Sequence, residues 1–162
     1  MGKVVSLTTL VRIRARLRRQ GKRVVFTNGT FDILHRGHVE YLAAARKMGD
    51  ILIVGLNSDS STRRIKGPER PINRSADRAA VLAALASVDY VCSFGEDTPH
   101  RMIRRLLPDV LVKGADWKKA AIVGNDVVKE NGGSVRTVRL TPGRSTTNII
   151  GRVLRAYAGR GK

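Results

Sequence analysis

Apolar residues recur along the chain in short continuous runs, separated by stretches with helical spacing. The runs predict buried strands, because strands covered on both faces are near-continuously hydrophobic. The predicted strands are Val24–Thr27, Ile51–Leu56, Asp89–Phe94, Val110–Val112 and Ser134–Leu140. Helical spacing and capping residues predict helices between them. These run from a Ser6 or Thr8 cap to Arg19, over His38–Met48, over Ala76–Ala86 after a Ser75 cap, from Thr98 to a stop at Pro108, and over Ala120–Glu130 and Thr146–Tyr157. We also expect Asp59 to cap a segment over Ser58–Arg64.

Strands that alternate with helices predict a parallel sheet with helices on both faces. Right-handed crossovers then give an α/β, Rossmann-like, doubly wound five-stranded parallel sheet. Ligands bind such sheets at the carboxyl ends of the strands, near the reversal in strand order. Functional residues are therefore expected just after Thr27, Leu56, Phe94, Val112 and Leu140.

The length of 162 residues predicts a single domain. We divide it into a basic N-terminal helix (1–21), a catalytic core (22–155) and a basic tail (156–162). The apolar fraction of 42% argues against disorder, and no apolar run is long enough for a membrane span. The lone cysteine, Cys92, excludes an intrachain disulfide and is expected in the core. The cytoplasm is the expected compartment.

The net charge of +18 first suggests a nucleic-acid partner. Its distribution argues otherwise, because residues 1–23 and 136–162 hold 8 and 7 basic residues and no acidic one. The middle of the chain, 24–135, has 16 basic and 13 acidic residues, a net charge of only +3. With aromatic residues at 4% and no zinc finger or RNA-recognition signature, a nucleic-acid role is disfavoured.

Two of the chain's three histidines, His35 and His38, follow the first predicted strand with Gly37 between them. This spacing puts both imidazoles at a loop-to-helix junction, where N–H donors can meet a phosphate. Two packing histidines are the alternative. A zinc pair would need a third ligand, such as Asp32 or Glu40, and the spacing fits no known zinc motif.

This stretch resembles the His-x-Gly-His signature of the nucleotidyltransferase superfamily that includes the cytidylyltransferases. Further segments fit the family in order and spacing, over about residues 22–155: Gly55–Asp59, Lys66–Gly67, Arg70–Asn73, Val112–Trp117 and Gly143–Ile150. Within the superfamily the chain is most similar to the adenylyltransferase domain of ADP-heptose biosynthesis. In many bacteria that domain follows a sugar kinase; at 162 residues we expect a stand-alone form with a separate heptose kinase upstream.

The resemblance implies AMP transfer from ATP to D-glycero-β-D-manno-heptose 1-phosphate, with release of pyrophosphate. It implies catalytic roles for His35, His38 and Lys66, and possible acceptor-phosphate contacts by Arg64 and Arg70. The implied nucleotide-binding residues are Asn28, Gly29, Thr30, Phe31, Gly114, Asp116, Ser145, Thr146 and Thr147. Mg²⁺ is expected mainly through substrate phosphates, so we name no metal ligand. The family is commonly dimeric, so a homodimer is expected.

The chain departs from the family's cytidylyltransferases at two positions. Leu140 stands where they tend to carry an arginine, and Asn148 where they carry a lysine. Both departures weigh against CTP as the donor, although a CTP-dependent enzyme acting on glycerol 3-phosphate or a related phosphorylated polyol or sugar stays the alternative. Arg144, just before the Ser-Thr-Thr triplet, receives no role.

Overall fold

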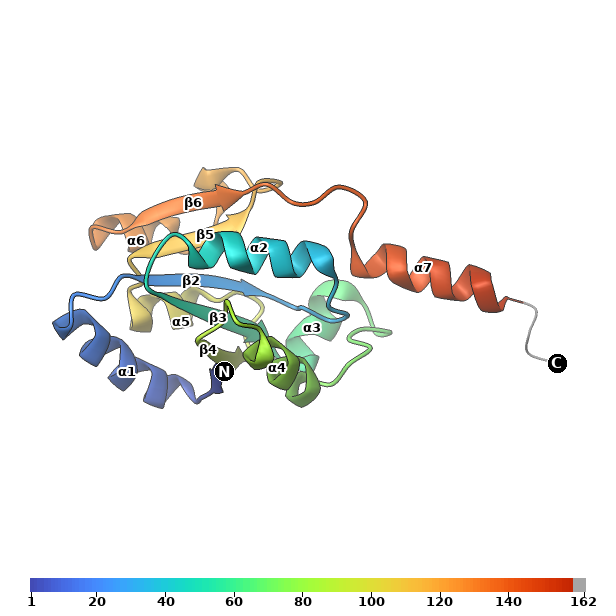
Figure 1. The fold of residues 1–162 in the computed structure, drawn as a ribbon, viewed down its shortest axis with the longest axis horizontal. Helices are drawn as coiled ribbons and strands as arrows, with labels where there is room; N and C mark the ends of the chain where they lie inside the picture. Colours follow the sequence, from blue (N-terminus) through green and yellow to red (C-terminus); the bar gives the residue numbers. More distant parts are fainter. Residues whose placement is uncertain (159–162) are drawn as a thin grey trace.

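A computed structural model describes residues 1–158 of the chain, so the end of the expected basic tail lies outside the described residues. Six parallel strands form one sheet in this part of the chain, in the order β1-β4-β3-β2-β5-β6. The strands are β1 Lys3–Val4, β2 Val24–Gly29, β3 Ile51–Asn57, β4 Tyr90–Phe94, β5 Val110–Gly114 and β6 Ser134–Val138. The doubly wound, Rossmann-like sheet is confirmed, with six strands instead of five (Figure 1).

The strand missed from the sequence is β1. It is only two residues long, and both are exposed, so it carries no run or alternation to detect. Pairing with the edge of β4 sets its position, with Lys3 opposite Tyr90 and Val4 opposite Val91.

The helices are α1 Leu7–Arg19, α2 Arg36–Arg46, α3 Asp59–Lys66, α4 Ser75–Ala84, α5 His100–Leu106, α6 Asn125–Glu130 and α7 Thr146–Tyr157. The expected helix over Ala120–Glu130 is wrong in its first half. A 3₁₀ turn, η1 Lys119–Ala121, precedes α6, and Gly124 separates the two at a φ of 85°. Because that backbone conformation is left-handed, a continuous helix is excluded there.

Two capping predictions are also wrong. Ser58, not Asp59, caps α3, since its side chain accepts from the Ser61 N–H at 3.2 Å. Arg74 is the N-cap residue of α4, and Ser75 is already helical.

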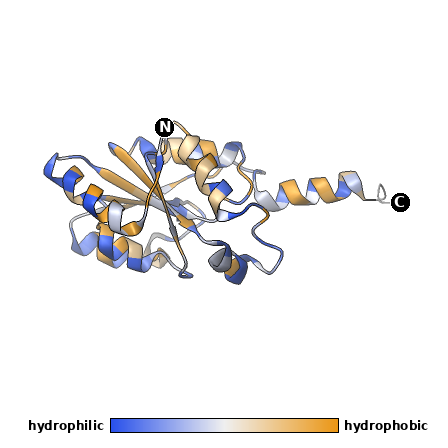
Figure 2. Ribbon diagram, turned by 90° about the horizontal axis from the view of Figure 1, so that it is seen from below, coloured by the Kyte–Doolittle hydropathy of each residue, from blue (hydrophilic) through white to orange (hydrophobic). Residues whose placement is uncertain are grey.

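Two apolar clusters cover the two faces of the sheet. On one face, α2 and α4 pack Leu42 and Leu82 against β-strand residues such as Val25. On the other face, α1, α5 and α6 pack against the alternate strand residues, among them Phe26 and Cys92. Figure 2 shows the resulting apolar interior along the strands. Cys92 is buried in this second cluster, so it is the core residue expected from the sequence. Burial also raises the pKa of its thiol to about 11.

No helix in the described part of the chain is both long and apolar enough to cross a membrane. The C-terminal helix α7 projects away from the sheet and its covering helices (Figure 1), and none of its residues is buried.

A buried guanidinium on α4 connects three segments near the carboxyl end of the sheet. The side chain of Arg78 is fully buried. It donates to the carbonyl oxygens of Thr30 and Asn73 and to the carboxylate of Asp59, the last at 2.7 Å. Arg78 therefore fixes the loop after β2, the start of α3 and the segment before α4 relative to one another.

Replacing Arg78 with methionine should lower the free energy of unfolding by about 3 kcal/mol, because two carbonyls and a carboxylate lose their donor. Urea denaturation followed by circular dichroism measures this. Arg74→Met, at the exposed start of the same helix, is the matched control and should change stability by less than about 0.5 kcal/mol. Equal stability of the two variants would contradict this role for Arg78.

Candidate active site

A cavity of about 600 Å³ opens at the carboxyl ends of the strands. It is lined by residues from the ends of both β2 and β5, the neighbouring strands at which the strand order reverses, and this is where doubly wound sheets bind ligands. Thirteen of the fourteen site residues expected from the sequence line it: Asn28, Gly29, Thr30, Phe31, His35, His38, Lys66, Arg70, Gly114, Asp116, Ser145, Thr146 and Thr147.

Arg64 is the exception. Its guanidinium donates to the Asp97 carboxylate and to the Gly95 carbonyl, both at 2.6 Å. Those contacts hold Arg64 against the loop that follows β4, and it is not among the lining residues. In this structure Arg64 thus stays outside the lining of the cavity, whereas Arg70 is part of it, and the acceptor-phosphate contacts of both stay predictions.

The two histidines form a stacked pair at the start of α2. Their ring centroids lie 3.8 Å apart with an interplanar angle of 21°, and the edge of Phe31 meets His38 at 5.2 Å. Gly37 makes this placement possible. A Cβ at position 37 would lie 3.1 Å from Nδ1 of His35 and 3.2 Å from Cβ of Arg144.

Both imidazoles are neutral at pH 7. Burial, with a smaller effect of His35, lowers the pKa of His38 to about 4. Burial and the nearby Arg144 also lower the pKa of His35. The Nδ1 atoms of both rings are buried without a hydrogen-bond partner among the described residues. The pair thus holds unused polar atoms at the cavity, in an environment that disfavours their charged form.

The loop after β2 has a constrained backbone. Phe31 is buried at a φ of 43°, which is uncommon for a residue with a side chain. The buried guanidinium of Arg78 donates a hydrogen bond to the carbonyl of the neighbouring Thr30. The side-chain oxygen of Asn28 is buried with no partner in the described part of the chain. This loop therefore presents fixed backbone and an unsatisfied acceptor to the cavity.

A buried carboxylate, Asp32, ties the segment before α4 to this loop. Its side chain has no exposed surface and accepts from the N–H groups of Ile72 and Asn73, at 2.8 and 2.9 Å, and from Nε of Arg70 at 2.5 Å. Burial raises the pKa of Asp32, but these hydrogen bonds outweigh it and hold the pKa below its ordinary value. Asp32 consequently places Arg70 at the wall of the cavity.

The N-terminus of α7 forms the opposite wall. Ser145 caps the helix by accepting from the Asn148 N–H at 3.0 Å, and Thr146 donates to the Ile33 carbonyl at 3.2 Å. The first N–H groups of a helix have no intrahelical acceptor and attract anions. The Asn148 side chain donates to the Gly143 carbonyl at 3.2 Å, which gives this departure from the family pattern a structural role.

The other end of the cavity is more apolar. Gly114, Asp116, Trp117, Val123 and Leu140 line it, and the side chains of Trp117 and Leu140 are about half exposed. A Cβ at Gly114 would lie 2.4 Å from Oδ1 of Asp116, so only glycine allows the carboxylate to lie there. An apolar ring face beside a carboxylate suits a nucleoside, with the base against the ring and the ribose hydroxyls near Asp116.

Several lining residues carry no expectation from the sequence. Tyr41 is buried within α2, and its hydroxyl contacts Thr27 at 2.7 Å and donates to the Val112 carbonyl at 3.1 Å. Lys113 and Arg144 are cations of the wall. Of these three residues, only Lys113 could have been found from the sequence, because it is a charged residue directly after an apolar run. The placement of Tyr41 and Arg144 at the cavity depends on tertiary packing.

The zinc alternative finds no support in the described residues, because no three His, Cys, Asp or Glu side chains are grouped to hold a metal ion. Asp32 is bonded to Arg70, and Glu40 accepts from Arg36 on the exposed side of α2. The lining instead contains four cations, Lys66, Arg70, Lys113 and Arg144, against two carboxylates, Asp97 and Asp116. This excess of positive charge suits a ligand with several phosphates.

Comparison with known proteins agrees with this geometry. A family described as cytidylyltransferase-like matches residues 26–152. The bifunctional protein HldE of Syntrophotalea carbinolica is 56% identical over 86% of this chain, and that of Geobacter sulfurreducens is 54% identical over 96% of it. Those matches cover 29% and 32% of the two relatives, so the chain spans about a third of the length of these curated relatives.

A solved structure shares the fold. The lipopolysaccharide core biosynthesis protein from Thermoplasma volcanium superposes with a TM-score of 0.62 at 30% sequence identity, over 75% of this chain and 98% of that one. The family match covers most of the sheet and every wall of the cavity. The chain therefore belongs to the cytidylyltransferase-like family of nucleotidyltransferases.

Proposed function

We propose that the protein transfers AMP from ATP to D-glycero-β-D-manno-heptose 1-phosphate, giving ADP-heptose and pyrophosphate. One observation carries the proposal: a single cavity gathers a neutral imidazole pair, a helix N-terminus and an apolar end lined by Trp117 and Leu140. The similarity to HldE proteins supports the same reaction.

The reaction needs positioning more than proton transfer. A phosphate oxygen of the sugar phosphate attacks the α-phosphorus of ATP, and the bond to the β-phosphate breaks. The attacking oxygen is already ionised at pH 7, so no general base is required. His35 and His38 donate to the triphosphate, the start of α7 binds its far end, and Lys66 bridges donor and acceptor phosphates.

Mg²⁺ fits this site through its substrate rather than through a protein cage. When bound, it neutralises charge on the triphosphate. Asp97 is already paired with Arg64, which leaves Asp116 as the other carboxylate of the wall. Substrate phosphates and water therefore supply most of the ligands that Mg²⁺ needs.

ATP is the proposed donor because the positions that distinguish the cytidylyltransferases differ here. Leu140 adds an apolar side chain to the nucleoside end, and Asn148 bonds to the loop before α7 instead of offering a cation. CTP-dependent transfer to glycerol 3-phosphate is the alternative to be tested beside it.

Pyrophosphate release should be fastest with ATP, the heptose 1-phosphate and Mg²⁺, and lower by at least about tenfold with CTP. A coupled assay over a matrix of nucleotides and sugar phosphates measures this. Turnover with CTP and glycerol 3-phosphate, and none with ATP and the heptose phosphate, would replace the proposed substrates with the alternative.

Changing His38 to glutamine should lower kcat/KM by about 10²–10³, the usual effect of removing one donor to a transition-state oxyanion. A bound triphosphate should also raise the low pKa of His38. Binding of ATP with saturating Mg²⁺ should therefore take up protons between about pH 4 and pH 6.5, and affinity should rise as the pH falls through that range. Calorimetry in buffers of different ionisation enthalpy measures the uptake.

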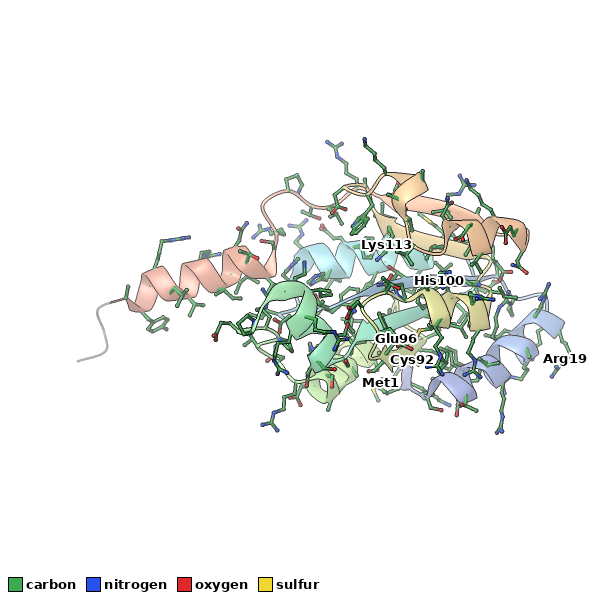
Figure 3. All side chains as sticks on the ribbon, turned by 180° about the vertical axis from the view of Figure 1, so that it is seen from behind. Met1, Arg19, Cys92, Glu96, His100 and Lys113 are labelled. Carbon is green, nitrogen blue, oxygen red and sulfur yellow. The ribbon has the colours of Figure 1, made fainter. Side chains whose placement is uncertain are left out.

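His100 is the matched control. It begins α5 (labelled in Figure 3), is not among the lining residues of the cavity, and is the third histidine of the chain. His100→Gln should retain both turnover and proton uptake. A His38→Gln protein with unchanged uptake and turnover would remove the imidazole from the proposed mechanism.

We further propose a homodimer held by α7, with a heptose kinase supplying the sugar 1-phosphate. Apolar side chains recur at helical spacing along α7, on one stripe: Ile149, Ile150, Val153, Leu154 and Tyr157. Val153, Leu154 and Tyr157 are 51%, 65% and 63% exposed. A stripe of this kind is typical of a surface that is covered in an assembly.

The double substitution of Val153 and Leu154 by glutamate should shift the protein from dimer to monomer in size-exclusion chromatography with light scattering. Arg152→Glu, on the polar face of α7, should leave the dimer intact. A monomeric wild-type protein at micromolar concentration would refute the dimer without touching the proposed reaction.

A further inference from the structure

Lys113 is a partly buried cation of the cavity wall with no role assigned so far. It lies near the end of β5, beside the end of β2, where the strand order reverses. Figure 3 shows Lys113 within the body of the molecule. Its ammonium donates to the Asn28 carbonyl at 3.3 Å and lies 5.7 Å from the centre of the Trp117 ring.

The surroundings of Lys113 compensate its charge incompletely. An ammonium has three N–H donors, and the described residues give it one carbonyl acceptor and the face of one ring. No carboxylate lies within ion-pair distance of it in the described part of the chain. Burial lowers its pKa to about 8, against an opposing effect of Asp116. Keeping such a cation in a folded protein costs stability unless an anion joins it.

The position between its neighbours indicates which anion. On one side lies Asn28, near the end of β2 and just before the loop expected to hold the reacting phosphates. On the other side lies Trp117, at the nucleoside end of the cavity. Lys113 thus lies between the nucleoside end and the phosphate end of the site, where the two substrates must meet.

We infer that Lys113 is a catalytic residue that binds the reacting phosphates, donating to non-bridging oxygens of the donor α-phosphate or of the acceptor phosphate. The inference rests on the proposed nucleotidyl transfer. In that step a bond forms between the acceptor phosphate oxygen and the α-phosphorus. The bond from the α-phosphorus to the bridging oxygen of the β-phosphate breaks, and pyrophosphate leaves with the electron pair. Lys113 keeps its protons and balances charge that grows on the equatorial oxygens.

The test compares ligands that differ by one phosphate, using calorimetry on the full chain. For the donor, the wild-type protein should bind AMP more tightly than adenosine. For the acceptor, it should bind the heptose 1-phosphate more tightly than the free heptose. Lys113→Met removes the charge at nearly constant volume and should reduce one of these two ratios by about tenfold or more. Adenosine affinity should stay unchanged, and the ratio that falls identifies the phosphate.

Lys129→Met is the matched control for net charge, because Lys129 is exposed on α6 and does not line the cavity. The Lys129→Met protein should keep both the preference for AMP over adenosine and the preference for the heptose 1-phosphate over the free heptose. Lys113→Arg should keep most of the affected ratio, since it restores a cation. The thermal stability of Lys113→Met should equal or exceed that of the wild type, because a partly buried charge without an ion-pair partner has been replaced by an apolar chain. If that variant does not fold, Lys113→Gln serves in its place.

Unchanged ratios in a folded Lys113→Met protein would overturn the inference and leave the proposed function standing. An equal loss of adenosine and AMP affinity would also overturn it, because Lys113 would then recognise the nucleoside. A wild-type protein with no preference for either phosphorylated ligand and no pyrophosphate release would overturn the proposed function and this inference together.

Discussion

Two buried ions, Asp32 and Arg78, hold the loops of the site to the end of the sheet. Each is satisfied mainly by backbone groups: Asp32 by two N–H groups, and Arg78 by two carbonyls. The loop after β2 buries the ring of Phe31, but a loop beside an open cavity has little room for further apolar side chains. Charge-assisted hydrogen bonds to backbone provide rigidity without filling the cavity, so Arg70 and the Thr30 backbone depend on these two ions for their positions.

Charge repulsion explains why both histidines of the stacked pair are neutral. An imidazolium facing phosphate would bind more strongly, yet two cations stacked at 3.8 Å would repel one another in the free protein. Keeping both rings neutral removes that repulsion and leaves N–H donors for the ligand. The positive charge that faces a ligand in the cavity then comes from four other lining residues: Lys66, Arg70, Lys113 and Arg144.

Periodicity predicted the sheet, its winding and six of the seven helices at least in part, because apolar runs and caps are local signals. The failures share a different cause. The edge strand β1 exists only through pairing with β4, and the break at Gly124 depends on one left-handed residue. At the cavity, thirteen of the fourteen residues expected from motif order are lining residues; Arg64 instead contacts Asp97, a partner 33 positions distant that no local pattern reveals.

The basic residues of this +18 chain divide by what satisfies them. Arg14 on α1 is buried against the carbonyls of Leu106 and Leu107 and the carboxylate of Asp109, so it fastens α1 to the turn before β5. Arg78 is satisfied in the same way. Lys113 is only partly buried, and its described partners are one carbonyl and a ring. Arg14 and Arg78, whose donors are met by protein acceptors, stabilise the fold, whereas Lys113 keeps donors free at the cavity wall, where an incoming phosphate would add the acceptors that it lacks.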